Sequence, residues 1–203
     1  MVWSEILIIL TSALGATYIF SALKSKHQDV KNLCLLVLVS IILFQINKFL
    51  SYDYSWIVSD VLNLSIFSII LTILLITVRK LKPDFSRYPY VIAFFPFLIP
   101  MLYPLIIGND SIIYLVLQLL QIAALLSLVL LLMSQFEEKR TLLLTVLAVV
   151  LFVAAGVLYW FEEPIQIGFW LWKSLTAIGI GLISFTITNF FNHNTNVNRY
   201  EYQ

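Results

Sequence analysis

Residues that bind metals and haem are scarce in this sequence of 203 residues. It contains one cysteine, Cys34, and two histidines, His27 and His193. A single cysteine excludes a disulfide within the chain, and metal or haem sites need several His, Cys or carboxylate ligands close together. We therefore expect no cofactor and no metal.

The sequence also lacks the short motifs of the common enzyme classes. It has no HExxH, CxxC, GxSxG or P-loop pattern, so zinc hydrolases, thiol oxidoreductases, nucleophile-elbow hydrolases and P-loop ATPases have no support. The net charge of +1 gives no indication of nucleic acid as a partner. The balance is against an enzyme, although an intramembrane enzyme of another design stays open.

Charge of either sign is rare as well. Charged residues make up 11% of the chain and apolar residues 61%, whereas soluble domains carry about 25% charged residues. A soluble core of this size could not bury so much apolar surface. In hydrocarbon the backbone must be hydrogen-bonded internally, and a helix of about 20 apolar residues achieves this. Long continuous apolar runs, unlike the short alternating strands of a barrel, predict an all-α polytopic transmembrane helical bundle.

Seven apolar stretches predict seven spans. They comprise residues 2–23, 33–50, 55–78, 90–107, 111–135, 141–160 and 168–191. The connections are too short for a second folded domain. We therefore expect a single seven-helix membrane domain over residues 1–191 and a short polar cytoplasmic tail over 192–203. The second and fourth stretches depart most from an uninterrupted apolar helix, and losing either one would place the tail on the opposite side.

The basic residues lie almost entirely in alternate connections. Ten of the twelve fall on one side of the predicted thread: Lys24, Lys26, Lys31, Arg79, Lys80, Lys82, Arg87, Lys139, Arg140 and Arg199. Because cytoplasmic loops carry the excess of Lys and Arg, this pattern places the N-terminus outside and the C-terminus in the cytoplasm. The membrane would be a plasma membrane or a bacterial inner membrane.

The tryptophans agree with this orientation. All five would lie near the outer interface, where amphipathic rings are favoured: Trp3, Trp56, Trp160, Trp170 and Trp172.

Polar residues within the predicted spans gather toward the outer half. The pocket candidates are Lys48, Asp60, Asn63, Gln118, Gln121 and Lys173, together with Glu163 in the last outer loop. A charge in hydrocarbon is costly and therefore suggests a functional site, so these groups predict an outward-facing polar pocket. Two alternatives stay open. The charges could snorkel to the interface, and the amides could simply join helices to one another.

Three prolines spaced four residues apart mark the fourth stretch. Pro96, Pro100 and Pro104 each remove a backbone donor, so the helix should kink or unwind there. Broken helices line the substrate path in transporters, whereas a static kink that serves packing is the alternative.

Three functions are compatible with these observations. We expect a binding or sensory module, or an accessory membrane subunit, that acts through a protein partner at its basic cytoplasmic loops. A small transporter or channel-like protein with an outward pocket for a small molecule is the second alternative, and an intramembrane lipid-modifying enzyme is the third. Seven spans with a cytoplasmic C-terminus are also typical of receptor-type sensors, an analogy of topology alone.

Overall fold

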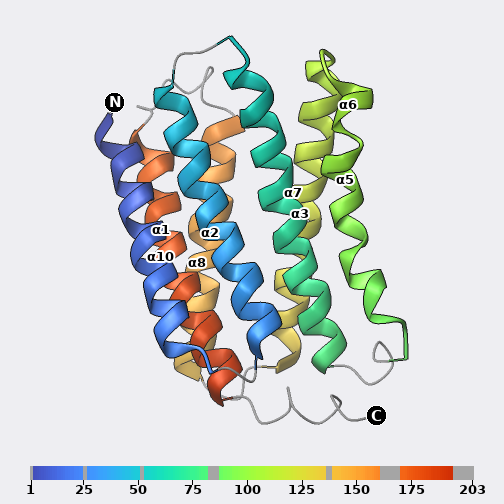
Figure 1. Ribbon diagram of the computed structural model, residues 1–203. Coiled ribbons are helices and arrows are strands. Elements are labelled where there is room, and N and C mark those ends of the chain that lie inside the picture. Colours follow the sequence, from blue (N-terminus) through green and yellow to red (C-terminus); the bar gives the residue numbers. More distant parts are fainter. Residues whose placement is uncertain are drawn as a thin grey trace.

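The computed structural model describes residues 2–24, 27–50, 53–81, 87–135, 139–160 and 170–193, which form helices and no strands. The predicted all-helical class is confirmed. Six helices are long and apolar enough to cross a membrane. They are α1 (Val2–Ala22), α2 (Gln28–Phe49), α3 (Ser55–Leu81), α7 (Asp110–Gln135), α8 (Lys139–Trp160) and α10 (Trp170–His193). They stand side by side as a bundle (Figure 1).

The segment that carries the three prolines is not one regular helix. It consists of a 3₁₀-helix, η2 (Tyr90–Phe97), and two single-turn helices, α5 (Leu98–Met101) and α6 (Tyr103–Ile106). Proline lacks the amide hydrogen of a regular helical ladder, which accounts for a chain broken into short pieces. In Figure 1 this segment runs beside α3 from one end of the bundle to the other. We call residues 90–106 the broken segment.

Helices α2 and α3 extend furthest beyond their apolar stretches, and they do so at the same end of the bundle. Helix α2 begins at Gln28 rather than at residue 33, and α3 continues to Leu81 rather than ending at residue 78. The reason is electrostatic. Asp29 in the first turn of α2 forms an ion pair of 3.0 Å with Lys80 in the last turn of α3, and each charge also suits the dipole of its own helix.

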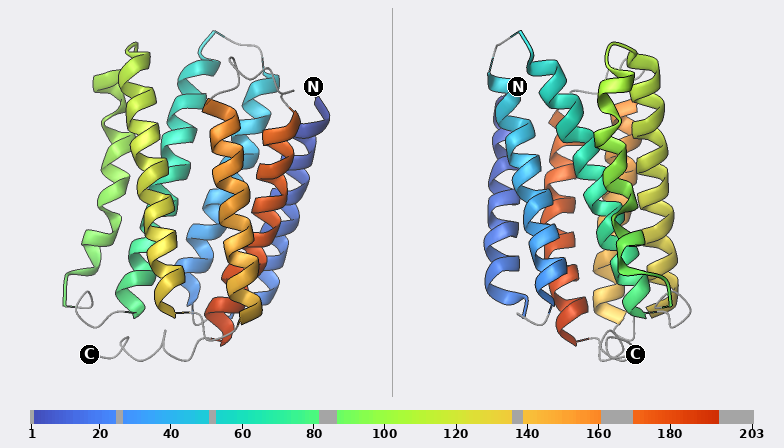
Figure 2. Two further views of the ribbon diagram at one scale, coloured as in Figure 1. Left: turned by 180° about the vertical axis from the view of Figure 1, so that it is seen from behind. Right: turned by 45° about the vertical axis from the view of Figure 1, so that its right-hand side comes forward.

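The helices form a chain of packed neighbours (Figure 2). Helix α1 lies between α2 and α10, α10 also contacts α8, and α3 lies between α2 and α7. Helix α7 barely contacts α8. One apolar core joins α1, α2, α3, η2 and α10, and a smaller core joins α3, α6 and α7. Apolar packing is therefore continuous on the α1 side and sparse between α7 and α8.

Helices α1 and α10 approach each other closely at Gly15. A Cβ atom at this position would lie 2.6 Å from Ser184 Oγ, which leaves no room for any larger residue without movement. Small residues allow such approaches between helices in membranes, where dispersion contacts replace the hydrophobic effect.

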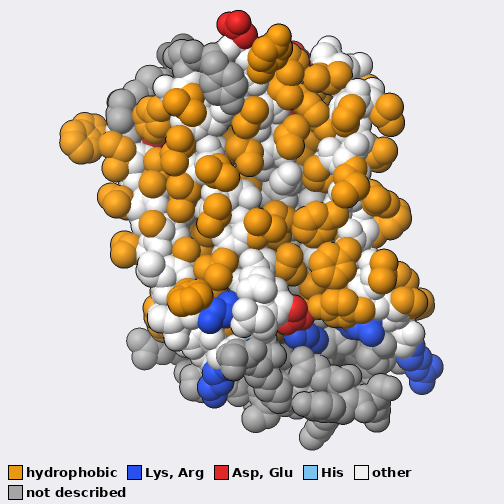
Figure 3. Space-filling view, viewed as in Figure 1, with side chains coloured by type: hydrophobic (Ala, Val, Ile, Leu, Met, Phe, Trp, Pro, Cys, Tyr) orange, Lys and Arg blue, Asp and Glu red, His pale blue; other side chains and the backbone are white. Residues whose placement is uncertain are grey.

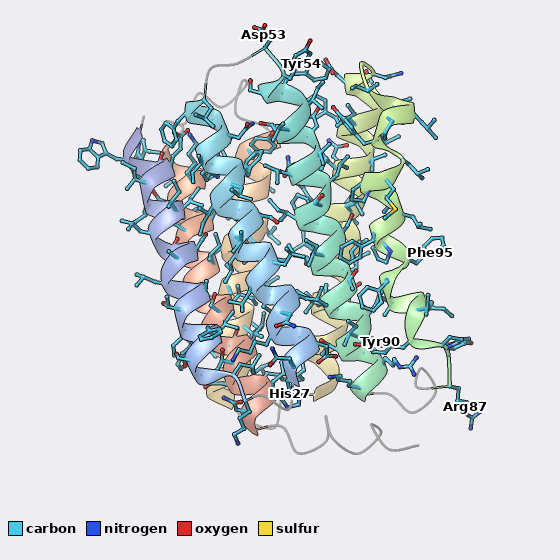
Figure 4. The ribbon with its side chains drawn as sticks, viewed as in Figure 1. His27, Asp53, Tyr54, Arg87, Tyr90 and Phe95 are labelled. Atoms are coloured by element: carbon cyan, nitrogen blue, oxygen red, sulfur yellow. The ribbon has the colours of Figure 1, made fainter. Side chains whose placement is uncertain are left out.

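The two ends of the bundle differ in charge. We call the end with Asp53 the acidic end and the end with Arg87 the basic end (Figure 4). Apolar side chains cover the face between them (Figure 3). Many are highly exposed, such as Trp3 at 83%, Val91 at 77% and Leu105 at 82%. Exposing so large an apolar surface to water would be unfavourable. Together with the six long apolar helices, this surface indicates a multi-pass membrane protein.

The predicted polar tail lies largely outside the described residues. Helix α10 continues through Asn192 and His193, and residues 194–203 are not described. Asn192 Nδ2 donates a hydrogen bond of 2.8 Å to the backbone oxygen of Ala22, so the first tail residue packs against the end of α1.

Candidate functional site

A cavity of about 580 Å³ lies at the acidic end, where α2 ends, α3 and α7 begin and α8 ends. Its lining residues are Phe44, Lys48, Trp56, Ser59, Asp60, Asn63, Gly108, Asp110, Ile113, Tyr114, Leu117 and Tyr159. The volume falls within the roughly 300–1,000 Å³ typical of small-molecule sites. The cavity brings together three of the seven pocket candidates, namely Lys48, Asp60 and Asn63.

Two carboxylates form one side of the cavity. Asp60 lies near the start of α3, and Asp110 is the first residue of α7. They are close enough for the charge of Asp110 to act on Asp60. Tyr103 of the broken segment is 3% exposed, and its hydroxyl donates a hydrogen bond of 3.0 Å to Asp60 Oδ2. This bond holds Oδ2 of Asp60, and within the described part of the chain Oδ1 accepts no other side-chain hydrogen bond.

The amine of Lys48 also lines the cavity. Lys48 lies in the last turn of α2, and its Nζ is 4.3 Å from the centroid of the Phe44 ring. Within the described residues no carboxylate lies within ion-pair distance of Lys48. The cavity therefore contains an ammonium and two carboxylates that do not neutralise one another in direct pairs.

A buried amide joins the helix end that carries Lys48 to the helix start that carries Asp60. Asn47 is 4% exposed, and its Nδ2 donates to the Ser55 backbone oxygen at 2.7 Å and to Ser59 Oγ at 2.8 Å. These bonds tie the end of α2 to the start of α3. Lys48 directly follows Asn47, and Asp60 directly follows Ser59. The bonds of Asn47 therefore fix the backbone of Lys48 relative to the backbone of Asp60.

Aromatic rings supply much of the remaining wall. Trp56, Tyr114 and Tyr159 come from α3, α7 and α8, and all three side chains are partly exposed in the cavity region. The Tyr159 ring also lies 5.2 Å from that of Trp172, centroid to centroid, which links this wall to α10. Ring faces attract organic cations, so the carboxylates and the rings favour the same kind of group.

Lys173 lies elsewhere. Its Nζ forms an ion pair of 2.8 Å with Glu5 Oε1, with side-chain exposures of 7% and 15%. This pair joins α10 to α1, and Lys173 is not among the lining residues of the cavity. The pair and Lys48 are near enough to interact electrostatically.

The remaining pocket candidates do not line the cavity in the described part of the chain. Gln118 is exposed on α7, whereas Gln121 is half-buried and engaged in an interaction of its own. The cavity is lined by Asp110, Ile113, Tyr114 and Leu117 in the first two turns of α7, and Gln118, one turn beyond Tyr114, is not among the lining residues. Glu163 lies outside the described residues.

The break candidates lie on the path between the two ends. Pro96 is buried in η2, Pro100 lies in α5 and Pro104 lies in α6 beside Tyr103. At the basic end, the hydroxyl of Tyr90 donates a bond of 2.7 Å to Asp29 Oδ2, and the guanidinium of Arg79 lies over the Tyr90 ring (Figure 4).

The sequence did not single out several of the lining residues. Asp110, for example, falls in a connection between two predicted spans. Tyr103 does not line the cavity but bonds Asp60, and it lies among apolar residues without a polar neighbour at helical spacing. The signal that could have found Asp110 is its position at the start of an apolar stretch, two residues after Gly108, which has a φ of 81° and also lines the cavity. No signal in a single sequence pairs Tyr103 with Asp60.

Side-chain oxygen atoms that could coordinate a metal ion come from Ser59, Asp60, Asn63 and Asp110 at the cavity. Among the described residues, no group of three or more His, Cys, Asp or Glu lies together in a way that could hold a metal ion.

Comparisons with protein-family models, with curated proteins and with solved structures gave no match.

Proposed function

We propose that this protein is a seven-span membrane binding module, receptor-like in topology, that holds a small ligand in the cavity at its acidic end. The N-terminus lies outside and the C-terminus lies in the cytoplasm. The broken segment supplies the seventh crossing, supported by its course from end to end of the bundle (Figure 1). Its membrane is a plasma membrane or a bacterial inner membrane.

One observation carries this proposal. The cavity combines Lys48, Asp60 and Asp110 at the end opposite to the basic loops. Charges next to hydrocarbon are retained where they serve a ligand or a partner, and these three have no direct ion pair with one another. The positive-inside pattern places this end outside the cell. The ligand therefore reaches the cavity from the outer side.

The basic end is the proposed docking surface for a protein partner. Lys24, Lys31 and Arg87 lie at the same end as the ion pair of Asp29 and Lys80, in which Lys80 is buried and Asp29 is half-buried. A partner with an acidic surface would complement these charges. Ligand binding at the outer cavity would change the conformation of the helices that connect the two ends, and the partner would respond to that change.

Native mass spectrometry of the protein, extracted gently from its own membrane, tests the binding function. We expect a small molecule or lipid that co-purifies at fixed stoichiometry. Asp60→Asn should reduce its occupancy at least about tenfold, because a charge-assisted hydrogen bond contributes about 1.5–3 kcal/mol.

Asp53→Asn is the matched control, because it removes the same charge from the same end at an exposed residue that does not line the cavity. Its occupancy should equal that of the wild type. A bare wild-type chain, or equal loss in both variants, would contradict the proposal.

Transport is a second candidate function, favoured by the bond between Tyr103 and Asp60. It couples a proline-broken segment to the cavity, as in transporters whose discontinuous helices line the binding site. Uptake of the co-purified ligand into proteoliposomes would distinguish a transporter, which releases ligand on both sides, from a binding module, which does not.

A further inference from the structure

Charges of opposite sign lie on different walls of the cavity. Lys48 comes from α2, whereas Asp60 and Asp110 come from α3 and α7. A ligand that carried only a cation would satisfy the carboxylates and leave the lysine without a counter-ion, and an anion alone would have the converse defect. A ligand that carries both charges can form charge-assisted hydrogen bonds with both sides at once.

The carboxylate side suits an organic ammonium group. Asp60 and Asp110 both line this side of the cavity, and two like charges there favour a cation as their partner. Asp60 keeps Oδ1 available while Tyr103 holds Oδ2. The rings of Trp56, Tyr114 and Tyr159 add cation-attracting faces, whereas a hard metal ion would require a fuller shell of oxygen ligands.

The lysine side suits an acid group. The Lys48 ammonium lies over the Phe44 ring and has no ion pair within the described residues, so its hydrogens can be donated to a carboxylate or a phosphate. Lys173 is paired with Glu5, and among the described residues Lys48 is the one Lys or Arg that lines the cavity.

We infer that the ligand of this cavity is a zwitterion, with its ammonium group at Asp60 and Asp110 and its acid group at Lys48. This inference rests on the proposed function and names its ligand class. A free amino acid and the ethanolamine phosphate headgroup of a lipid share this chemistry. The lipid source is geometrically open, because the cavity is lined from both α7 and α8, two helices that barely contact each other.

Binding of soluble probes to the delipidated, detergent-purified full chain tests the inference. The probes are phosphoethanolamine and γ-aminobutyrate, with ethanolamine and inorganic phosphate as single-charge controls. We expect at least one zwitterion to bind about tenfold more tightly than either single-charge control, because each adds a charge-assisted bond that the controls lack.

Variants assign the two groups. Lys48→Gln should bring the zwitterion down to the affinity of ethanolamine, and Asp60→Asn should bring it down to that of phosphate. Asp53→Asn should leave the affinities for the zwitterions and for the single-charge controls unchanged. Three results would contradict a zwitterionic ligand: equal affinity for ethanolamine and the zwitterions, an unchanged zwitterion affinity in Lys48→Gln, or no binding of any probe.

The two proposals fail separately. If a co-purifying molecule is lost in Asp60→Asn while no zwitterion binds, the binding function stands and the zwitterion is wrong. If nothing co-purifies and nothing binds, both are wrong. Nanodiscs distinguish the sources: phosphatidylethanolamine should compete with the soluble probe if the ligand is a lipid headgroup, and phosphatidylglycerol nanodiscs should give the same probe affinity as detergent.

Discussion

At the scale of single residues, the ion pair between Glu5 and Lys173 shows why a buried charge need not belong to a binding site. Both side chains are largely buried, and Glu5 lies in the first turn of α1, where a negative charge suits the helix dipole. The pair satisfies each charge and joins α1 to α10. Removing one partner would leave the other charged and buried without compensation.

We therefore predict that Glu5→Gln and Lys173→Gln each destabilise the bundle by about 3 kcal/mol. The double variant should be more stable than the sum of the two effects implies, because neither charge is then left alone. Thermal unfolding in detergent, followed by tryptophan fluorescence, measures the cycle. Strict additivity would show that the two side chains do not act as a pair.

The limits of the sequence are clear at this scale. Asp60 and Asn63 are three residues apart and therefore share a helical face, and both line the cavity. Lys48 and Lys173 were indistinguishable in the sequence, because each lies near the end of an apolar stretch. Their environments differ only through the partner that tertiary packing supplies, Glu5 for one and the cavity for the other.

At the scale of helices, close approach at Gly15 makes α1 and α10 a fixed pair. Its Cβ position lies against Ser184 Oγ, whose hydrogen bond to the Ile180 backbone oxygen restricts its movement. Gly181 on α10, in contrast, has no atom within 4 Å of its Cβ position. The same substitution at the two glycines therefore separates packing from helix propensity.

We predict that Gly15→Val destabilises the protein by about 1–3 kcal/mol, since the added methyl groups force the helices apart. Gly181→Val should change stability by less than about 0.5 kcal/mol. The same unfolding assay compares them. Equal destabilisation by the two variants would mean that the close approach contributes nothing.

The broken segment is the element that sequence periodicity described least completely. Its prolines indicate an interrupted helix, but they do not indicate where its ends are held. Tyr90 bonds Asp29 at the basic end and Tyr103 bonds Asp60 at the cavity, two long-range pairs that single-sequence patterns do not encode. In the proposed function, these two bonds make the segment a link between the cavity and the docking surface.

At the scale of the whole molecule, apolar composition determines most of what can be predicted. Long apolar runs predicted the all-helical class and the positions of the six long helices, because hydrocarbon permits few other backbone structures. The start of α2 at Gln28 and the end of α3 at Leu81 were not predicted, since these polar helix ends depend on the ion pair of Asp29 and Lys80. The number of crossings and the orientation stay part of the proposal.

The accessibility of the cavity from outside the cell is the central claim, and labelling with a membrane-impermeant thiol reagent tests it most directly. The wild-type chain is a low-background control, because Cys34 is its only cysteine and is 4% exposed. Asn63→Cys places a thiol in the cavity, and Tyr88→Cys places one at the exposed basic end without removing a basic residue. On intact cells we predict labelling of Asn63→Cys and protection of Tyr88→Cys until the membrane is permeabilised. Labelling of Tyr88→Cys with protection of Asn63→Cys would contradict both the orientation and the outward-facing cavity.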